Sequence, residues 1–302
     1  MTHRFTRRQT INAIGLAAAT SGLPLGSSAG ARDLPTQTAS EGGRPKWLTL
    51  PATPALPETP RQGVAPVNGT EIFYAQFGGG SPVLLLHGGL ANSNYWGHQV
   101  QHLAQNFLVT VMDTRGHGRS PVTSRAFGYR VFAEDTAALL DFLKISEAAM
   151  VGWSDGAVTG LQLSMMRPDR VTKLFAFGGN ASADGLKPGG ARSSVFTTYA
   201  SRCRTEYQRL SPRPERWPQL LDGLRVMWRT EPNFTSKDLA GVKATTVIAD
   251  GEYDEIIRRD HTERMAQEIP RARLVLLPGV SHFAMLQDPA AFNRALSAFL
   301  AA

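Results

Sequence analysis

Short, continuous runs of apolar residues recur along the chain from about residue 64, and several are separated by segments of helical periodicity. A run that is apolar at every position is typical of a strand buried on both faces of a sheet. We therefore expect strands at residues 82–86, 107–112, 148–153, 173–177, 244–249 and 273–277. Helices are expected at residues 132–143, where the apolar side chains share one face, at 155–166 and around 289–300.

The first two apolar runs, residues 64–67 and 72–77, flank Asn68-Gly69. This dipeptide predicts a hairpin, because both positions of the tight turn require a positive φ. A hairpin followed by alternating strands and helices predicts an α/β fold, with a mostly parallel central sheet and helices on both faces. The alternation is interrupted at about residues 183–241, and we expect a largely helical cap insertion there, over one edge of the sheet.

The first 31 residues have the layout of a secretory signal. Three arginines, including the adjacent pair Arg7-Arg8, precede a short apolar segment, and Ala29-Gly30-Ala31 offers small residues for cleavage. The apolar segment is too short, and too interrupted by Gly22 and Pro24, to span a bilayer. The paired arginines resemble a twin-arginine export signal, which implies a periplasmic location.

Prolines recur from residue 32 to residue 60, where few apolar residues could anchor a core. This composition predicts an extended, proline-rich linker. Residues 61–302 are then expected to form one domain that includes the cap insertion.

Composition narrows the possible classes of function. With 42% apolar and 19% charged residues, a packed core is expected. The formal net charge is +7, but no basic block is interleaved with aromatic residues, which argues against nucleic-acid binding.

Cys203 is the only cysteine, so neither an intramolecular disulfide nor a cysteine-based zinc site is expected. No metal-ligand spacing or phosphate-binding loop is evident, and we expect no metal and no cofactor. The oligomeric state is left open.

Chemically reactive side chains follow four of the predicted strands. They lie in His87-Gly88-Gly89, in Gly152-Trp-Ser-Asp-Gly156, in Asp250-Gly-Glu-Tyr-Asp254 and in Gly279-Val-Ser-His282. Because the carboxyl ends of parallel strands meet at one side of the sheet, these segments should lie close together. Taken alone, Ser154 fits two roles: a nucleophile on a sharp turn or the N-cap of the following helix.

The segment GWSDG matches the Gly-x-Ser-x-Gly nucleophile elbow, and residues 61–302 resemble the α/β-hydrolase family. The family order of serine, acid and histidine is met by Ser154, Asp254 and His282. The resemblance implies that Ser154 is the nucleophile, His282 its base and Asp254 the acid that orients the imidazole. Asp250 competes as the acid, but the family's Gly-x-x-Asp pattern favours Asp254, and Glu255 is expected to be solvated.

The resemblance also implies an oxyanion hole made by the backbone N–H groups of Gly89 and Asp155. His87 is expected to shape its loop.

Hydrolysis of a small-molecule carboxylic ester is the leading function. The same triad also serves lactonases, C–C bond hydrolases, amino-terminal peptidases and cofactor-free haloperoxidases. A non-catalytic ligand-binding protein of this fold is a further alternative.

Two residues beside the nucleophile are candidates for substrate specificity, namely Asp155 and Trp153. The acidic residue in GWSDG resembles the elbow of the valacyclovir hydrolase-like branch, in which it suits esters that carry an amine. The alternative is that the Asp155 carboxylate only complements the N-terminus of its own helix, a contribution of ~0.3–1 kcal/mol.

Overall fold

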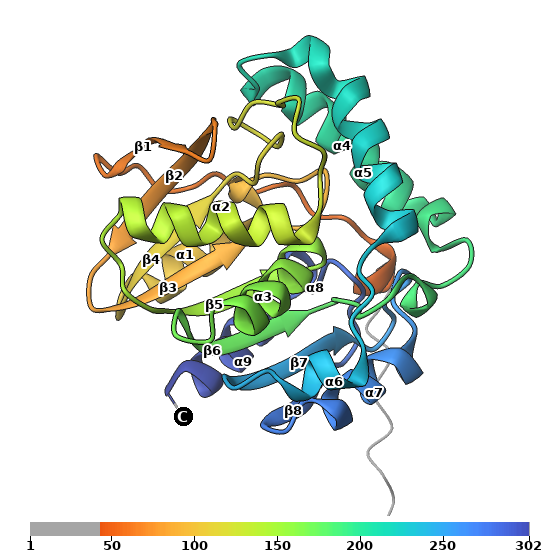
Figure 1. Ribbon diagram of the computed structural model, residues 1–302. Coiled ribbons are helices and arrows are strands. Elements are labelled where there is room, and N and C mark those ends of the chain that lie inside the picture. Colours follow the sequence, from red (N-terminus) through yellow and green to blue (C-terminus); the bar gives the residue numbers. More distant parts are fainter. Residues whose placement is uncertain (1–42, 302) are drawn as a thin grey trace, which may run out of the picture. The chain divides into compact units, whose positions relative to one another are not determined.

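A single eight-stranded sheet, in the order β1-β2-β4-β3-β5-β6-β7-β8, organises residues 43–301, the part of the chain that this computed structural model describes (Figure 1). The strands are β1 (Gln62–Val67), β2 (Thr70–Gly78), β3 (Ser81–Leu86), β4 (Phe107–Met112), β5 (Ala148–Trp153), β6 (Val171–Phe177), β7 (Thr245–Gly251) and β8 (Ala272–Leu277). The pairs that involve β2 are antiparallel, and all other pairs are parallel. The mostly parallel sheet expected from the sequence is confirmed.

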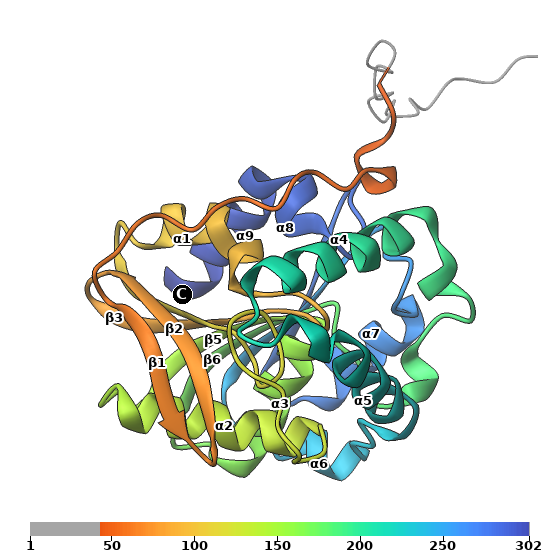
Figure 2. The same cartoon turned by 90° about the horizontal axis from the view of Figure 1, so that it is seen from above.

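Helices cover both faces of the sheet (Figures 1 and 2). The α-helices are α1 (Gly97–Leu103), α2 (Tyr129–Phe142), α3 (Asp155–Met166), α4 (Ser194–Leu210), α5 (Trp217–Thr230), α6 (Ser236–Ala240), α7 (Arg259–Glu268), α8 (Ala284–Gln287) and α9 (Pro289–Ala301). Short 3-10 helices are η1 (Lys46–Leu48), η2 (Ser93–Trp96), η3 (Ala183–Gly185), η4 (Gly190–Arg192) and η5 (Pro214–Arg216).

The two faces of the sheet form two separate hydrophobic cores. Along β3, Val83 and Leu85 pack into the core beneath α1 and α9, whereas Leu84 and Leu86 pack into the core beneath α2, α3 and α7. Successive side chains of a strand point to opposite faces, so a strand between two cores must be apolar at every position. This requirement explains why the continuous apolar runs predicted the strands.

The cap, residues 183–241, contains α4 and α5 and lies over the carboxyl ends of the central strands (Figure 2). The expectation that it would cover an edge of the sheet was wrong, because the edges are β1 and β8. The face of α4 that packs downward includes the buried residues Val195, Tyr199 and Cys203. These side chains join the same core as the strand residues of β3 and β5, so the cap is an integral layer of the fold.

The N-terminal signal expected at residues 1–31 lies outside the described residues, as does most of the predicted linker. From Arg44 onward the chain belongs to the compact unit. Residues up to 60 run along that unit in a largely extended conformation, held by polar contacts. Gln287 donates to the Thr49 carbonyl at 2.8 Å, and the Arg202 guanidinium donates to the carbonyl of Leu50 at 2.7 Å. Among residues 43–301, no helix is both long enough and apolar enough to cross a membrane.

Candidate active site

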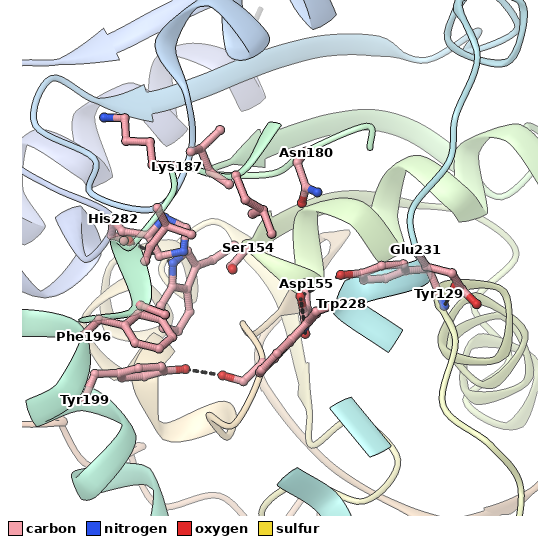
Figure 3. Close-up of a pocket in the computed structure, with 17 residues that line it drawn as sticks. Tyr129, Ser154, Asp155, Asn180, Lys187, Phe196, Tyr199, Trp228, Glu231 and His282 are labelled. Carbon is pink, nitrogen blue, oxygen red and sulfur yellow. Dashed lines mark hydrogen bonds between the residues drawn. The ribbon is translucent and has the colours of Figure 1, made fainter. Parts of the chain in front are cut away.

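A cavity of about 170 Å³ lies between the strand ends and the cap. Its floor includes Gly89, Ser154, Asp155, Asn180 and His282, and its roof includes Phe196, Tyr199 and Trp228 (Figure 3). Most of the lining is apolar. Three of the four segments that the sequence places at strand ends therefore line one cavity, and the fourth reaches it through the contact of Asp254 with His282.

Ser154 sits on a tight turn between β5 and α3. Its φ of 55° and ψ of −121° are rarely adopted by a residue with a side chain. The chain can turn this sharply because Gly152 and Gly156 have no side chains. A methyl group on Gly152 would lie 2.5 Å from the backbone nitrogen of Ala157, and one on Gly156 would overlap the Leu86 carbonyl.

The Ser154 side chain faces the cavity (Figure 3). Ser154 does occupy the N-cap position of α3, but its hydroxyl makes no capping hydrogen bond to the helix. An N-cap serine normally accepts a bond from the second or third helical N–H group. The capping role left open by the sequence is therefore not the one that the hydroxyl performs.

The imidazole of His282 is bonded to Asp254, with 2.6 Å between Nδ1 and Oδ2. Both side chains are buried. The other carboxylate oxygen of Asp254 accepts the N–H groups of Ile256 at 2.6 Å and Ile257 at 2.7 Å, which fixes its orientation. Asp250, the competing acid, instead accepts bonds from the Gly251 N–H and the Thr262 hydroxyl.

The charges of this pair support each other. Burial disfavours the charged form of each group, but the mutual attraction is larger. The pKa of Asp254 is lowered to about 2, against the effect of burial, chiefly by His282. The pKa of His282 is raised, again against burial, by Asp254 first and then by Glu255 and Asp155. An ionised Asp254 can hold Nδ1–H and leave Nε2 free to accept a proton.

Two further side chains hold the backbone of His282. The indole N–H of Trp153 donates to the His282 carbonyl at 2.8 Å, and Glu255 accepts the His282 N–H at 3.2 Å. Trp153 has no exposed surface, and its ring lies 5.9 Å from the imidazole. The expectation that Glu255 is solvated was wrong, because its carboxylate turns inward and burial raises its pKa.

His87 orients the peptide group that precedes Gly89. Its Nδ1 donates to the Gly88 carbonyl at 2.8 Å, since its Nε2 accepts the Thr114 N–H at 3.0 Å. The Ala91 N–H reaches the same carbonyl at 3.2 Å. In a trans peptide the N–H points opposite to the carbonyl, so the Gly89 N–H points away from His87. The Asp155 N–H lies in the first turn of α3 and has no partner within the helix.

The side chain of Asp155 has partners that the sequence did not reveal. Its carboxylate accepts the Trp228 indole N–H at 2.9 Å and the Tyr129 hydroxyl at 2.8 Å. Burial raises the pKa of Asp155 to about 6, and these two donors oppose the shift. The cap residue Trp228 and the α2 residue Tyr129 therefore meet at a carboxylate in the wall of the cavity (Figure 3).

Comparisons with known proteins agree with this geometry. Residues 81–205 match the family model described as alpha/beta hydrolase fold. The human serine hydrolase BPHL is 29% identical over 248 residues, covering 78% of this chain and 84% of that protein.

Two solved structures share the fold. Est816, described as an N-acyl homoserine lactone degrading enzyme, superposes with a TM-score of 0.69 at 24% identity, over 78% of this chain and 100% of that chain. The enol-lactonase from Burkholderia xenovorans does so with a TM-score of 0.64 at 23% identity, over 80% of this chain and 100% of that chain. The sheet topology, the family match over residues 81–205 and these two structures together show that the chain has the α/β-hydrolase fold.

Proposed function

We propose that this protein is a serine hydrolase that cleaves a small-molecule carboxylic ester through an acyl-enzyme. The observation that carries the proposal is the buried 2.6 Å contact of Asp254 with His282, which lines the same cavity as the strained Ser154. Serine needs a base to become a nucleophile, and an oriented neutral imidazole is such a base.

In the proposed reaction each group acts once while the acyl-enzyme forms and once while it is hydrolysed. Ser154 Oγ attacks the ester carbonyl while His282 Nε2 takes its proton, and Asp254 stabilises the resulting imidazolium. The N–H groups of Gly89 and Asp155 receive the carbonyl oxygen as it becomes negative. His282 then protonates the leaving alcohol. In the second half, His282 takes a proton from water, which attacks the acyl-enzyme. His282 then returns the proton to Ser154 as the carboxylic acid leaves.

Lactones, carbamates and strained C–C bonds are alternatives on the same machinery. An ester, including a lactone, needs only the nucleophile, the base and the two oxyanion donors, and so does a carbamate. A cofactor-free haloperoxidase requires further reactants, and a C–C bond hydrolase requires a group that stabilises a carbanion. A panel of nitrophenyl esters, lactones and amino-acid esters separates these substrate classes.

Replacing Ser154 with alanine should abolish turnover. Removal of a serine nucleophile typically costs on the order of a million-fold in kcat. Treatment of the wild-type protein with a serine-reactive phosphonate should add one phosphonyl group at Ser154, detected by peptide mass spectrometry. The Ser154→Ala variant should melt like the wild type and remain unlabelled. A well-folded wild-type protein that takes no label would count against the enzyme and favour a ligand-binding protein.

The two aspartates at the carboxyl end of β7, Asp250 and Asp254, should respond very differently to substitution. Asp254→Asn keeps the shape of the site but places an amide against Nδ1, which should lower kcat by ~10,000-fold through the wrong imidazole tautomer. Asp250→Asn serves as the matched control and should cost no more than about tenfold, because Asp250 makes no bond to His282. Steady-state kinetics of both variants test the assignment, and a reversed order would make Asp250 the acid.

Activity should fall at acidic pH. The nearby carboxylates raise the pKa of His282 above its ordinary value of about 6.5, so the imidazole becomes protonated, and inactive as a base, as the pH falls through that raised value. Below it, kcat/KM should drop about tenfold per pH unit. A profile of kcat/KM against pH on a neutral ester measures the midpoint. A flat profile between pH 5 and 8 would exclude His282 as the base.

We further propose that the cavity favours esters with a positive charge. The Asp155 carboxylate and Glu231 both line it, and Lys187, the cation among its lining residues, is held at 2.5 Å by the Asp254 carbonyl. The acidic end of the cavity is therefore available to a substrate cation. The preference should be modest, since Asp155 already accepts hydrogen bonds from Trp228 and Tyr129.

The test compares a choline ester with its neutral carbon isostere, because the quaternary charge does not titrate. Asp155→Asn should lower kcat/KM for the choline ester roughly tenfold more than for the isostere, a difference of about 1.4 kcal/mol. In the wild type, the ratio of the two kcat/KM values should fall as the pH drops through about 6, where Asp155 becomes protonated. Equal losses on both esters, with a constant ratio, would leave the carboxylate a purely structural role.

A further inference from the structure

Two aromatic side chains of the cap contact the two residues that carry the oxyanion donors. Tyr199, on α4, donates its hydroxyl to the carbonyl oxygen of Gly89. Trp228, on α5, donates its indole N–H to both carboxylate oxygens of Asp155, at 2.9 and 3.0 Å. Figure 3 draws these side chains around the cavity. Helices α4 and α5 of the cap thus each reach one side of the predicted oxyanion hole.

The loop that carries Gly89 is packed tightly against these groups. A methyl group on Gly89 would overlap the Asp155 carboxylate and lie 2.6 Å from Cζ2 of Trp228. The next residue, Leu90, has a φ of 68°, which a residue with a side chain rarely adopts. Such a conformation persists only where its surroundings hold it. The cap supplies part of these surroundings, through Tyr199 and Trp228.

The peptide groups on either side of Gly89 are fixed from opposite directions. His87 and the Ala91 N–H hold the carbonyl before it, and Tyr199 holds the carbonyl after it. The bonds to the Gly88 carbonyl set the direction of the Gly89 N–H. Because glycine has unusual freedom about φ and ψ, the Tyr199 bond is needed to fix the following peptide, and with it the position of Gly89 in the loop. Without Tyr199, one of the two constraints is lost.

We propose that the cap builds the oxyanion hole, with Tyr199 as the positioning residue for Gly89 and Trp228 as the positioning residue for Asp155. This inference rests on the proposed function. It gives the cap a part in the chemical step in addition to shaping the cavity. Neither side chain has to touch the reacting atoms, since each acts through the residue that it holds.

Tyr199 is suited to this task. It is buried, and its ring packs against Trp153 and Phe283 at centroid distances of 5.7 and 4.9 Å. Burial raises the pKa of its phenol well above the ordinary value, so the hydroxyl remains a donor across the working pH range. Removing only the hydroxyl leaves the aromatic packing in place, which makes phenylalanine an informative replacement.

Tyr199→Phe should lower kcat on a neutral ester about tenfold and change KM less than threefold. The loss is smaller than the ~100- to 1000-fold that follows removal of an oxyanion donor, because the donor is loosened and not deleted. Tyr207→Phe is the matched control. Tyr207 lies on the same helix, is also buried, and donates to the Arg213 carbonyl at 3.3 Å, away from the cavity. The Tyr207→Phe variant should have a kcat within twofold of the wild type.

The rate of phosphonylation gives a second measurement. The phosphonate oxygen occupies the oxyanion hole in the adduct, so the inactivation rate constant should fall in parallel with kcat for Tyr199→Phe. Trp228→Phe should slow both rates as well, whereas Trp217→Phe, on the same helix but outside the cavity lining, should not.

The outcomes separate this inference from the proposed function. Unchanged kcat and phosphonylation in Tyr199→Phe, with Ser154 still labelled, would overturn the positioning role and leave the hydrolase intact. Equal losses in Tyr199→Phe and Tyr207→Phe, with equal drops in melting temperature, would overturn it too, by assigning the effect to general loosening of the cap. Failure of the wild-type protein to label would refute the proposed function itself.

Discussion

The close approach of α3 to the ends of β3 and β5 is the constraint on which the rest of the site depends. The chain reverses direction at one residue, and it does so only because Gly152 and Gly156 leave room for backbone against backbone. The strain at Ser154, with its φ of 55°, costs of order 1–3 kcal/mol and is held by the packing of two buried cores. The same reversal places the Asp155 N–H, the first of α3, beside the serine. One turn therefore sets both the proposed nucleophile and one of the proposed oxyanion donors.

Around that turn, ring-bearing side chains hold the backbone carbonyl groups next to Gly89 and at His282. His87 and Tyr199 hold the carbonyls on either side of Gly89, and Trp153 holds the carbonyl of His282. Each bond is worth only ~1 kcal/mol to stability, but a buried carbonyl without a partner costs ~1–3 kcal/mol. A peptide group that turned over would leave its buried carbonyl without a partner, so the alternative orientations are disfavoured by ~1–3 kcal/mol. The aromatic residues thus determine geometry more than they add stability.

The elements predicted correctly from the sequence are those that a regular spacing of residues identifies. Strands buried on both faces are apolar throughout, and the helix after the elbow begins where the motif requires. Helix α7 was not predicted because it is mostly polar and buries few residues, among them Met265. Asp254 was separable from Asp250 only by the family pattern, since both follow the apolar run 244–249 in the sequence. The contacts of Trp228 and Tyr199 join residues 73 and 110 positions apart, and no local pattern encodes them.

Three carboxylates surround one imidazole, and their arrangement limits what each can do. Asp254, Glu255 and Asp155 all raise the pKa of His282, in that order, so the base is stronger than a solvated histidine and is lost at a higher pH. Of these three carboxylate groups, that of Asp155 accepts a hydrogen bond from the cap residue Trp228. A change in its charge therefore acts on the imidazole through the field and on the Gly89 loop through Trp228. Because one carboxylate has both effects, a substitution at Asp155 changes the pKa of the proposed base and the position of the proposed oxyanion hole together. This coupling gives a physical reason for an acid beside the nucleophile that is separate from any role in substrate choice.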